Sequence, residues 1–343
     1  MTSEIECKRA VGTLGSGAFS TVVRARDRQA GEEVAVKLIK RGSLVADRRL
    51  YVKREVAYLA GLSSHPCIVS AHEAFLTSTH LCIAMELVEG GTLFSFVLGP
   101  AARERPPLSV ADARWLFQML IIGLDFMHRR GVANRDVKLE NLLIDTTTAQ
   151  RPLLKICDLS YSKHDADSAA QTMVGTAAYL APEVVRWSEH YDAKKVDVWG
   201  AGIVLYALLY GQLPFEPSRP DIFAEHDERR RPPPPGRQVD PGAEQLLARM
   251  LARHPAQRPT MQQARAAMAG WCLEALVIDH SWFQTDLPPG ALTLNDELLT
   301  RTVDDPALAD RVSALVDAAC YSAADHHPLD RMTVNLRAGL APP

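Results

Sequence analysis

The sequence predicts an α+β protein with a strand-rich amino-terminal part and a mainly helical carboxy-terminal part. Three observations lead to this fold class. β-Branched residues flank a glycine-rich turn in residues 11–23, short strand patterns recur as far as residue 85, and helical periodicity prevails after residue 108. The 343 residues, 47% of them apolar, are enough for a large core and for two lobes.

The overall composition narrows the classes of function. Lys and Arg number 38 and Asp and Glu 41, so the formal net charge of −3 gives no basic footprint for nucleic acid. The longest apolar run, residues 198–210, is short for a membrane span of about 20 residues and predicts a buried helix. The six scattered cysteines form no C-x-x-C pair, which indicates free thiols in a reducing compartment. No early segment resembles a signal peptide. We therefore expect a cytoplasmic and/or nuclear protein with no nucleic-acid or membrane partner.

The first expected element is a hairpin over residues 11–23, which contains Gly15 and Gly17. Glycines let backbone N–H groups approach phosphate oxygens, because no Cβ stands in the way. By itself this G-x-G-x-x-S pattern also fits a plain turn or a degraded dinucleotide-binding fingerprint. A dinucleotide unit needs a helix directly after the glycines, whereas an alternating strand, residues 34–37, follows here and ends in Lys37.

A helix is expected next, over residues 44–62, because its apolar residues recur at helical spacing. This helix carries Glu55, which on its own could equally be a surface residue that pairs with neighbouring basic side chains. Short strands are then expected over residues 68–75 and 80–85. The glycines of residues 86–91 end this strand pattern.

The helical part begins with a strong helix over residues 108–130. Ser109 with Asp112 forms an amino-terminal capping pattern, and Gly131 closes the helix. The polar stretch that follows, residues 134–141, holds two acids, a lysine and an amide; its alternative is an exposed polar turn. Three further elements are expected. They are a strand over residues 153–157 followed by Asp158, a buried helix that contains residues 198–210, and a last helix over residues 306–321 with one apolar face.

Four motifs, in this order along the chain, resemble those of eukaryotic protein kinases. Residues 15–37 are similar to the glycine-rich loop and the V-A-I-K strand. Residues 134–141, N-R-D-V-K-L-E-N, are similar to the catalytic loop H-R-D-x-K-x-x-N, with Asn134 in place of the histidine. Residues 158–160, D-L-S, resemble D-F-G, and residues 181–183 keep A-P-E.

This resemblance implies the bilobal protein-kinase fold, in which a small lobe combines an antiparallel sheet with one helix and a large lobe is mainly helical. The expected kinase domain covers residues 1–288. Its parts would be the small lobe at about 1–85, the hinge at 86–91 and the large lobe at 92–288, followed by an extension at 289–343 with an amphipathic helix at about 306–321.

The resemblance also assigns roles in phosphoryl transfer. Asp136 is the expected catalytic base, which accepts the proton of the substrate hydroxyl, and Lys138 would balance charge on the phosphoryl group. Lys37 would hold the α- and β-phosphates of ATP and would itself be held by Glu55. The expected ligands of Mg2+ are Asn141 and Asp158.

The residues expected around the nucleotide are assigned by their offset from these motifs, and each apolar one could equally be ordinary core. Met85 would be the gatekeeper, while the Glu86 carbonyl and the Val88 amide would bond to adenine. The full set is Leu14, Gly15, Ser16, Gly17, Ala18, Phe19, Val22, Ala35, Lys37, Met85, Glu86, Val88 and Leu143.

Regulation and substrate binding are implied at a few further positions. Arg135 would pair with a phosphate on the activation segment, for which Thr172 is the best candidate site. Thr176 would hydrogen-bond the catalytic acid and lysine. Glu140 would contact basic residues upstream of the target hydroxyl. For Ser162, an unmodified surface hydroxyl is the alternative to a phosphosite.

Two buried polar groups and one subfamily likeness complete the resemblance. Asp197 would bond the amides of the catalytic loop, and Arg258 would pair with Glu183. Residues 138–141, 154–158 and 161–163 especially resemble plant SNF-related kinases of the second subfamily, in the calcium/calmodulin-dependent kinase group. Those kinases act in osmotic-stress and abscisic-acid signalling. In that subfamily a helix after the kinase domain packs on the small-lobe helix that carries the glutamate.

The expected function is therefore a serine/threonine protein kinase that uses ATP and Mg2+ to phosphorylate proteins, in stress signalling. Its partners would be protein substrates and an upstream activating kinase or a phosphatase. The alternative is a pseudokinase, because Asn134, Leu159 and Ser160 depart from the family motifs and Ser160 lacks the backbone freedom of glycine. None of these changes removes a proton acceptor, a metal ligand or the phosphate-binding lysine, which favours activity. A small-molecule kinase is disfavoured by the A-P-E segment.

Overall fold

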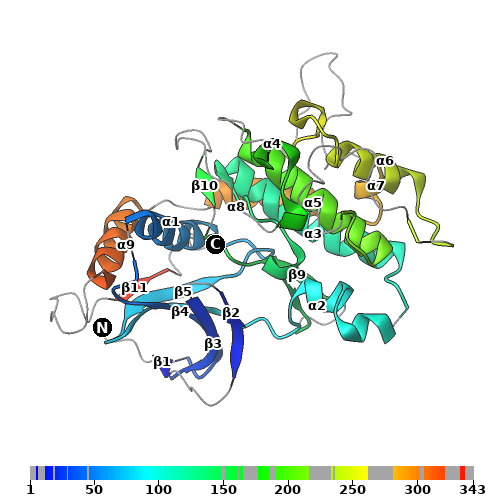
Figure 1. Cartoon of the computed structure of the whole chain (residues 1–343). Coiled ribbons are helices and arrows are strands. Elements are labelled where there is room, and N and C mark those ends of the chain that lie inside the picture. The colour runs from blue at the N-terminus through cyan, green and yellow to red at the C-terminus, as the bar shows by residue number, and fades with distance from the viewer. Residues whose placement is uncertain are drawn as a thin grey trace. The chain divides into compact units, whose positions relative to one another are not determined.

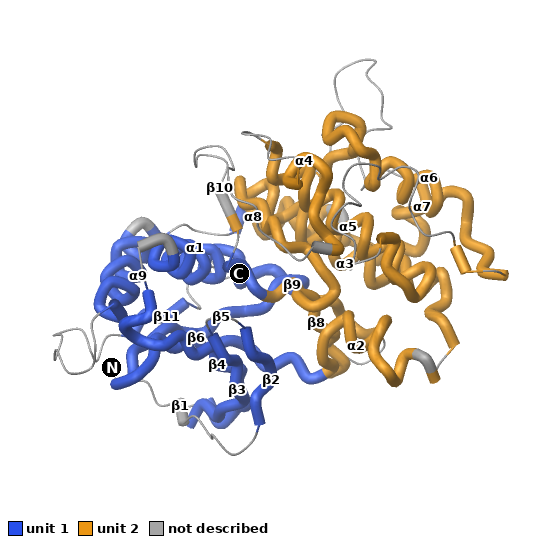
Figure 2. The backbone as a smooth tube through the Cα atoms, viewed as in Figure 1, with its two compact units in different colours: residues 1–89, 158–160, 300–343 blue, residues 90–157, 161–299 orange. Residues whose placement is uncertain are grey.

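The computed structural model divides into two compact units, coloured separately in Figure 2. Unit 1 contains residues 1–89, 158–160 and 300–343, and unit 2 contains residues 90–157 and 161–299. Most of the sequence-predicted extension thus belongs to unit 1. The residues that the structure describes are 5–6, 12–17, 20–28, 30–44, 46–104, 106–147, 151–160, 162–164, 177–185, 191–215, 233–234, 236–261, 281–301, 305–320 and 333–336.

Unit 1 is built on an antiparallel sheet, which has seven strands among the described residues, in the order β1-β3-β4-β6-β5-β11 with β2 paired to β3 (Figure 1). The expected hairpin is confirmed as β2 and β3, and β5 begins at Ala71 rather than at residue 68. The strands are β1 Ile5–Glu6, β2 Thr13–Ser16, β3 Ser20–Asp27, β4 Glu33–Lys40, β5 Ala71–Leu76, β6 His80–Glu86 and β11 Thr333–Asn335.

Successive side chains of a strand point to opposite faces, so β4 carries two different rows. Val34 and Val36 belong to an apolar cluster on one face. Ala35 and Lys37 therefore point to the other face. The remaining cluster members are Ala25, Phe75, Cys82 and Ala84.

Two helices of unit 1, α1 (Ala46–Leu62) and α9 (Pro306–Ala319), lie side by side (Figure 1). Lys53 of α1 donates hydrogen bonds to Ser313 Oγ at 2.8 Å and to Asp317 Oδ2 at 2.9 Å. Gly42 N, just after β4, donates to the carbonyl of Ala319 at 3.1 Å, which satisfies an acceptor at the end of α9. The packing that the resemblance implied, of a late helix on the helix that carries the glutamate, is confirmed.

Unit 2 is mainly helical. Its strands form two short pairs, β7 with β10 and β8 with β9. Its helices include α3, whose expected cap is confirmed because Ser109 Oγ accepts from Asp112 N at 3.0 Å. The elements are α2 Leu93–Val97, α3 Val110–Arg129, β7 Val132–Ala133, β8 Leu142–Asp145, β9 Leu153–Ile156, β10 Lys163–His164, α4 Pro182–Val185, α5 Ala193–Tyr210, α6 Pro241–Met250, α7 Ser281–Gln284 and α8 Ala291–Arg301, with short 3-10 turns at Pro100–Glu104, Leu139–Asn141, Ala177–Tyr179 and Pro255–Gln257. The last two residues of α8 fall in unit 1.

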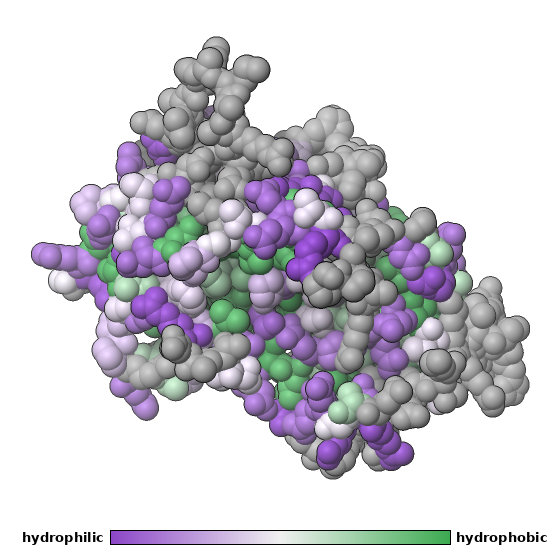
Figure 3. All heavy atoms as spheres, turned by 180° about the vertical axis from the view of Figure 1, so that it is seen from behind, coloured by the Kyte–Doolittle hydropathy of each residue, from purple (hydrophilic) through white to green (hydrophobic). Residues whose placement is uncertain are grey.

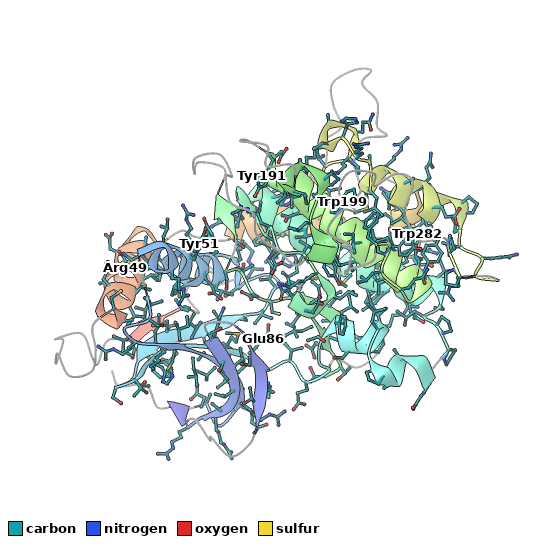
Figure 4. The ribbon with its side chains drawn as sticks, viewed as in Figure 1. Arg49, Tyr51, Glu86, Tyr191, Trp199 and Trp282 are labelled. Carbon is teal, nitrogen blue, oxygen red and sulfur yellow. The ribbon has the colours of Figure 1, made fainter. Side chains whose placement is uncertain are left out.

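Helix α5 contains the long apolar run and is buried from Val196 to Tyr210, as the sequence predicted. Asp192 caps its amino terminus, and Gly211, at φ 66°, ends it in a left-handed conformation that glycine adopts without strain. Trp199, labelled in Figure 4, stacks on Phe215 with ring centroids 5.6 Å apart. In the part of the chain that the structure describes, no helix is both long and apolar enough to span a bilayer.

The described surface is mixed in character. On the face seen in Figure 3, hydrophilic side chains cover much of the described surface, and hydrophobic ones show in smaller groups between them. The large hydrophobic side chains with high exposure among the described residues are Leu14, Leu50 and Phe94, which lie on separate elements. Single exposed apolar residues of this kind are normal for a globular protein.

A buried acid links α3 to α8 in unit 2. Asp125 is 1% exposed, and Asn295 Nδ2 donates to its Oδ2 at 2.7 Å and to the carbonyl of Ile122 at 3.0 Å. Burial raises the pKa of Asp125 above its ordinary value, although the Asn295 hydrogen bond and the charge of Arg129 lower it in part. The carboxylate therefore depends on Asn295 for its solvation.

Replacing Asn295 with leucine is expected to lower the free energy of unfolding by about 2–3 kcal/mol near pH 7, because a buried carboxylate loses its donor. The variant should raise the pKa of Asp125 further. Above the unfolded pKa of about 3.9, the folded state then holds more protons than the unfolded state, so stability falls as pH rises. Urea unfolding near pH 4 and near pH 7 should therefore show the larger loss at pH 7. An equal loss at both values would contradict this account.

Candidate active site

The glycine-rich turn joins β2 to β3. Gly17 N donates to the carbonyl of Ser20 at 2.9 Å, and Gly15 pairs with Val22 across the hairpin. Among the described residues, a Cβ at Gly15 would meet no atom within 4 Å, so they leave open space above this backbone. Of the six residues expected in this loop, Leu14 to Gly17 are placed here, whereas Ala18 and Phe19 lie outside the described residues.

Strand register brings several of the expected nucleotide residues together on the Lys37 face of the sheet. Val22 pairs with Lys37, and Ala35 pairs with Met85, and paired residues of an antiparallel ladder point to the same side. This face therefore carries apolar side chains together with Lys37, and the register places Arg24, the partner of Ala35, on the same side. Leu143, in contrast, belongs to β8 of unit 2.

Glu86 and Val88 follow at the end of β6. The Glu86 side chain is held because its Oε1 accepts from Ser70 N at 2.7 Å, and its own N–H donates to the Ser70 carbonyl at 2.9 Å. The backbone carbonyl of Glu86 and the amide of Val88 are the groups that the sequence assigned to adenine. Figure 4 labels Glu86 at this strand end.

Lys37 is 8% exposed and contacts three oxygen-bearing side chains of unit 1. Its Nζ donates to Glu55 Oε1, to Ser160 Oγ at 2.9 Å and to Asp158 Oδ1 at 3.4 Å. Burial alone would lower the pKa of Lys37, but the carboxylates of Glu55 and Asp158 raise it above its ordinary value. Lys37 is therefore a fixed positive charge at neutral pH.

Asp158 sits in a turn after β9, with φ at 63°. Short polar residues such as aspartate tolerate this left-handed region, and the turn is closed by Ser160 N, which donates to Asp158 Oδ1 at 3.1 Å. Burial on its own would raise the pKa of Asp158, but Lys37 and the Ser160 hydrogen bonds hold it below its ordinary value. Asp158 is therefore an anion, as a metal ligand must be.

The catalytic-loop acid belongs to unit 2. Asp136 is 5% exposed, and its Oδ2 accepts from Lys138 Nζ at 2.6 Å and from Asn141 Nδ2 at 2.8 Å. Asn141 Nδ2 also donates to the Asp136 carbonyl at 3.0 Å. The structure thus brings together the acid, the lysine and the amide that the sequence singled out within eight residues.

Asp197, on α5, holds the backbone of this loop. Its carboxylate accepts from Asn134 N at 2.8 Å and from Arg135 N at 2.7 Å, and His128 Nε2 lies 2.7 Å from its Oδ2. Arg135 has φ at 68°, which is uncommon for a non-glycine residue and needs such support. The expected structural role of Asp197 is confirmed.

Asn134, the departure from the family histidine, is 1% exposed. Its Oδ1 accepts from Asp136 N at 3.0 Å, so the side chain of Asn134 forms an Asx turn with the backbone two residues further on. The asparagine therefore orients the backbone of Asp136, the expected catalytic acid. The sequence showed the exchange but not this contact.

Gly200 allows α5 to approach the loop closely. A Cβ on Gly200 would lie 2.7 Å from the Val137 carbonyl oxygen, which no side chain could occupy without a shift. A small hollow lies beside this contact and is lined by residues 135–137, 179–180, Val196 and Gly200.

Three further contacts concern the expected regulatory and substrate residues of unit 2. Arg135 donates to the Tyr191 hydroxyl at 2.6 Å, a contact that no sequence signal indicated; Figure 4 labels Tyr191. Burial, together with the carboxylate of Glu140, raises the pKa of Tyr179 well above its ordinary value, so Glu140 lies beside this phenol. Arg258 pairs with both carboxylate oxygens of Glu183, at 2.6 and 2.8 Å, as expected.

One expectation is wrong and others fall outside the described residues. Ser162 is 1% exposed, so it is not a surface hydroxyl. Thr172 and Thr176 lie outside the described residues, as does most of the long segment between Arg258 and residue 280. Four cysteines that the structure describes, Cys67, Cys82, Cys157 and Cys320, are free thiols, as predicted.

Each unit holds one of the two expected magnesium ligands. Asp158, in unit 1, has a carboxylate, and Asn141, in unit 2, has an amide whose Nδ2 donates to Asp136, which leaves the amide oxygen out of those contacts. Mg2+ prefers oxygen ligands and uses one or two carboxylates together with substrate phosphates. In the described ranges there is no group of three or more His, Cys, Asp or Glu side chains that could hold a metal by itself.

Comparison with known proteins gives a family and several relatives. A model of the protein kinase domain matches residues 9–268. The serine/threonine-protein kinase SRK2E of Arabidopsis thaliana is 38% identical over 301 residues, which cover 86% of this chain and 76% of that protein. SAPK9 of Oryza sativa subsp. japonica is 36% identical over 302 residues, covering 86% and 76%. SRK2C of Arabidopsis thaliana is 37% identical over 305 residues, covering 86% and 81%.

Proposed function

The chain belongs to the protein kinase family and is a serine/threonine protein kinase, and from this premise we propose which of its residues carry out the transfer. Asp136 is the base that accepts the proton of the substrate hydroxyl. One observation carries this assignment: the Asp136 carboxylate is nearly buried and is held on Oδ2 by Lys138 and Asn141. Its orientation is thus fixed before a substrate arrives, which is what positioning catalysis requires.

Lys138 has a second role in this proposal. Its ammonium lies 2.6 Å from the catalytic carboxylate and can turn to the phosphoryl group as negative charge shifts there. Because Lys138 is hydrogen-bonded to Asp136, its ammonium is positioned near the reacting atoms together with the base.

ATP is bound by groups of unit 1 in this proposal. Lys37, kept protonated by Glu55 and Asp158, presents a positive charge to the phosphates, and the open space above the Gly15 backbone leaves room for them to approach. Asp158, in unit 1, and Asn141, in unit 2, are the residues that would hold Mg2+, and the ion would neutralise charge on the phosphates.

The rival function is a pseudokinase that binds nucleotide without chemistry. It is motivated by Asn134, Leu159 and Ser160. Two of these residues make contacts that support the site, since Asn134 accepts from the Asp136 amide and Ser160 bonds to Asp158. Leu159 is fully buried and so supplies the apolar side chain expected there. These contacts favour an active enzyme.

Replacing Asp136 with asparagine tests the proposal. We expect transfer of radiolabel from ATP to a generic basic protein to fall by roughly 100- to 10,000-fold, because the amide cannot accept the proton. Asp286→Asn is the matched control: this acid is an exposed partner of Arg114 and its variant should keep wild-type activity. If wild-type protein, even after phosphorylation by an upstream kinase, labels the substrate no better than Asp136→Asn, the pseudokinase becomes the better assignment.

A role in stress signalling is part of the same proposal. The likeness to the SRK2 and SAPK kinases, at 36–38% identity, supports it. Kinase activity of the chain recovered from cells before and after osmotic shock would test it, and unchanged activity would count against it.

A further inference from the structure

We propose that Ser160 is a positioning residue that holds the carboxylate of Asp158 in the orientation that binds a divalent cation. The inference rests on the proposed function, in which Asp158 is a magnesium ligand. Ser160 occupies the position that glycine holds in the family motif, and the sequence alone presented it only as a loss of backbone freedom. The contacts of unit 1 give it a positive role instead.

The hydroxyl of Ser160 lies between a cation and an anion. Lys37 Nζ donates to Ser160 Oγ at 2.9 Å, and Ser160 Oγ contacts Asp158 Oδ1. A lysine ammonium can only donate and an ionised carboxylate can only accept. The single hydroxyl proton of Ser160 is therefore donated to a carboxylate. Its contact is Asp158 Oδ1, and the carboxylate of Glu55 is a second acceptor nearby. The serine thus bridges the lysine and the acid.

Within the part of the chain that the structure describes, all hydrogen bonds to the Asp158 side chain end on one of its two oxygens, Oδ1. The donors are Ser160 N at 3.1 Å, Ser160 Oγ, and Lys37 Nζ at 3.4 Å. Oδ2 accepts none of them. The carboxylate is thus held in place through hydrogen bonds to Oδ1, and Oδ2 can bind a cation. Groups that orient a metal ligand in this way typically change metal affinity by 10- to 100-fold when removed.

The turn has no need of glycine at this position. Among the described residues the non-glycine positions with positive φ are Arg135, Asp158 and Asp286, so the backbone of Ser160 is in a region open to any residue. A glycine here would keep the N–H bond to Oδ1 but would leave the direct contact at 3.4 Å as the link between lysine and acid. The hydroxyl is therefore what completes the hydrogen bonds that hold Asp158.

Titration of the full chain with a non-hydrolysable ATP analogue, by calorimetry and over a range of MgCl2 concentrations, tests this role. In Ser160→Ala we expect the magnesium concentration for half-maximal tightening to rise about tenfold, with metal-free nucleotide affinity within about twofold of wild type. Ser160→Thr, which restores a hydroxyl, should recover most of the loss. Ser78→Ala, at an exposed serine in the β5–β6 turn, should match wild type. Circular dichroism checks that each variant is folded.

Two outcomes would overturn the role of Ser160. One is a magnesium requirement in Ser160→Ala within about twofold of wild type. The other is wild-type behaviour of Ser160→Gly together with a defect in Ser160→Ala, because that pattern would assign the effect to a methyl group rather than to the lost hydroxyl. Either result leaves the proposed function standing, provided that magnesium tightens nucleotide binding to the wild type. If magnesium has no effect on the wild type, the metal role of Asp158 fails and the role of Ser160 fails with it.

Discussion

Replacing Lys37 with methionine is expected to reduce phosphoryl transfer by about 100- to 1,000-fold, because a preorganised positive charge is lost from the face to which we assign the ATP phosphates. Methionine is about as long as lysine and keeps the apolar stem, so the sheet around β4 should retain its packing. The loss should appear mainly in kcat, since the charge acts on the reacting phosphates. The radiolabel assay at saturating ATP measures it.

The same substitution should also destabilise unit 1. Glu55 is 3% exposed and would lose its only cationic hydrogen-bond partner among the described residues, which leaves a buried carboxylate without its counter-charge. Breaking a buried pair in this way costs about 3–5 kcal/mol. Urea unfolding followed by circular dichroism should show this loss. Asp158 contributes less to the loss, because 38% of its side chain is exposed to solvent.

A second substitution separates the two effects. In Lys37→Met/Glu55→Leu, the unpaired carboxylate is gone and an apolar side chain fills its place, so most of the lost stability should return. Transfer activity should stay as low as in Lys37→Met. If activity returned along with stability, Lys37 would act only by supporting the fold, and its phosphate-binding role would be wrong.

The sequence predicted the elements that carry strong local signals. Helices α3 and α5 have long apolar patterns with recognisable caps, and the hairpin β2–β3 has a glycine turn between β-branched residues. The catalytic loop was found because its acid, lysine and amide are close in the chain, so no tertiary information was needed. Residues that lie this close along the chain can be recognised as a motif from a single sequence.

Features that depend on contacts between distant residues were not predicted. Strand β11 has three residues and gains its place by pairing with β5, so no periodicity could reveal it. The bridge from Lys37 through Ser160 to Asp158 joins positions far apart in the chain. In the sequence alone, a serine in place of glycine indicates only a loss of backbone freedom. Tyr191 on Arg135 is of the same kind.

The buried pair of Arg258 and Glu183 in unit 2 should give the largest loss of stability outside the catalytic groups. Arg258 is 2% exposed, and besides its two bonds to Glu183 it donates to the carbonyls of Ala252 at 2.8 Å and Lys195 at 3.0 Å. Its guanidinium also lies over the ring of Trp199, 4.9 Å from the centroid. These contacts tie the A-P-E segment to α5 and to the turn after α6.

Replacing Arg258 with methionine is therefore expected to lower the free energy of unfolding by about 3–5 kcal/mol, because Glu183 becomes an unpaired buried charge. All five tryptophans of the chain lie in the residue ranges of unit 2, so tryptophan fluorescence follows the unfolding of that unit. Arg258→Lys keeps the charge but loses the fork-shaped donor set, and its loss should be intermediate. In Arg258→Met/Glu183→Leu, stability should return to within roughly 1–2 kcal/mol of wild type. If the double variant were no more stable than Arg258→Met, the cost would lie in the lost carbonyl contacts and the Trp199 stack rather than in the stranded carboxylate.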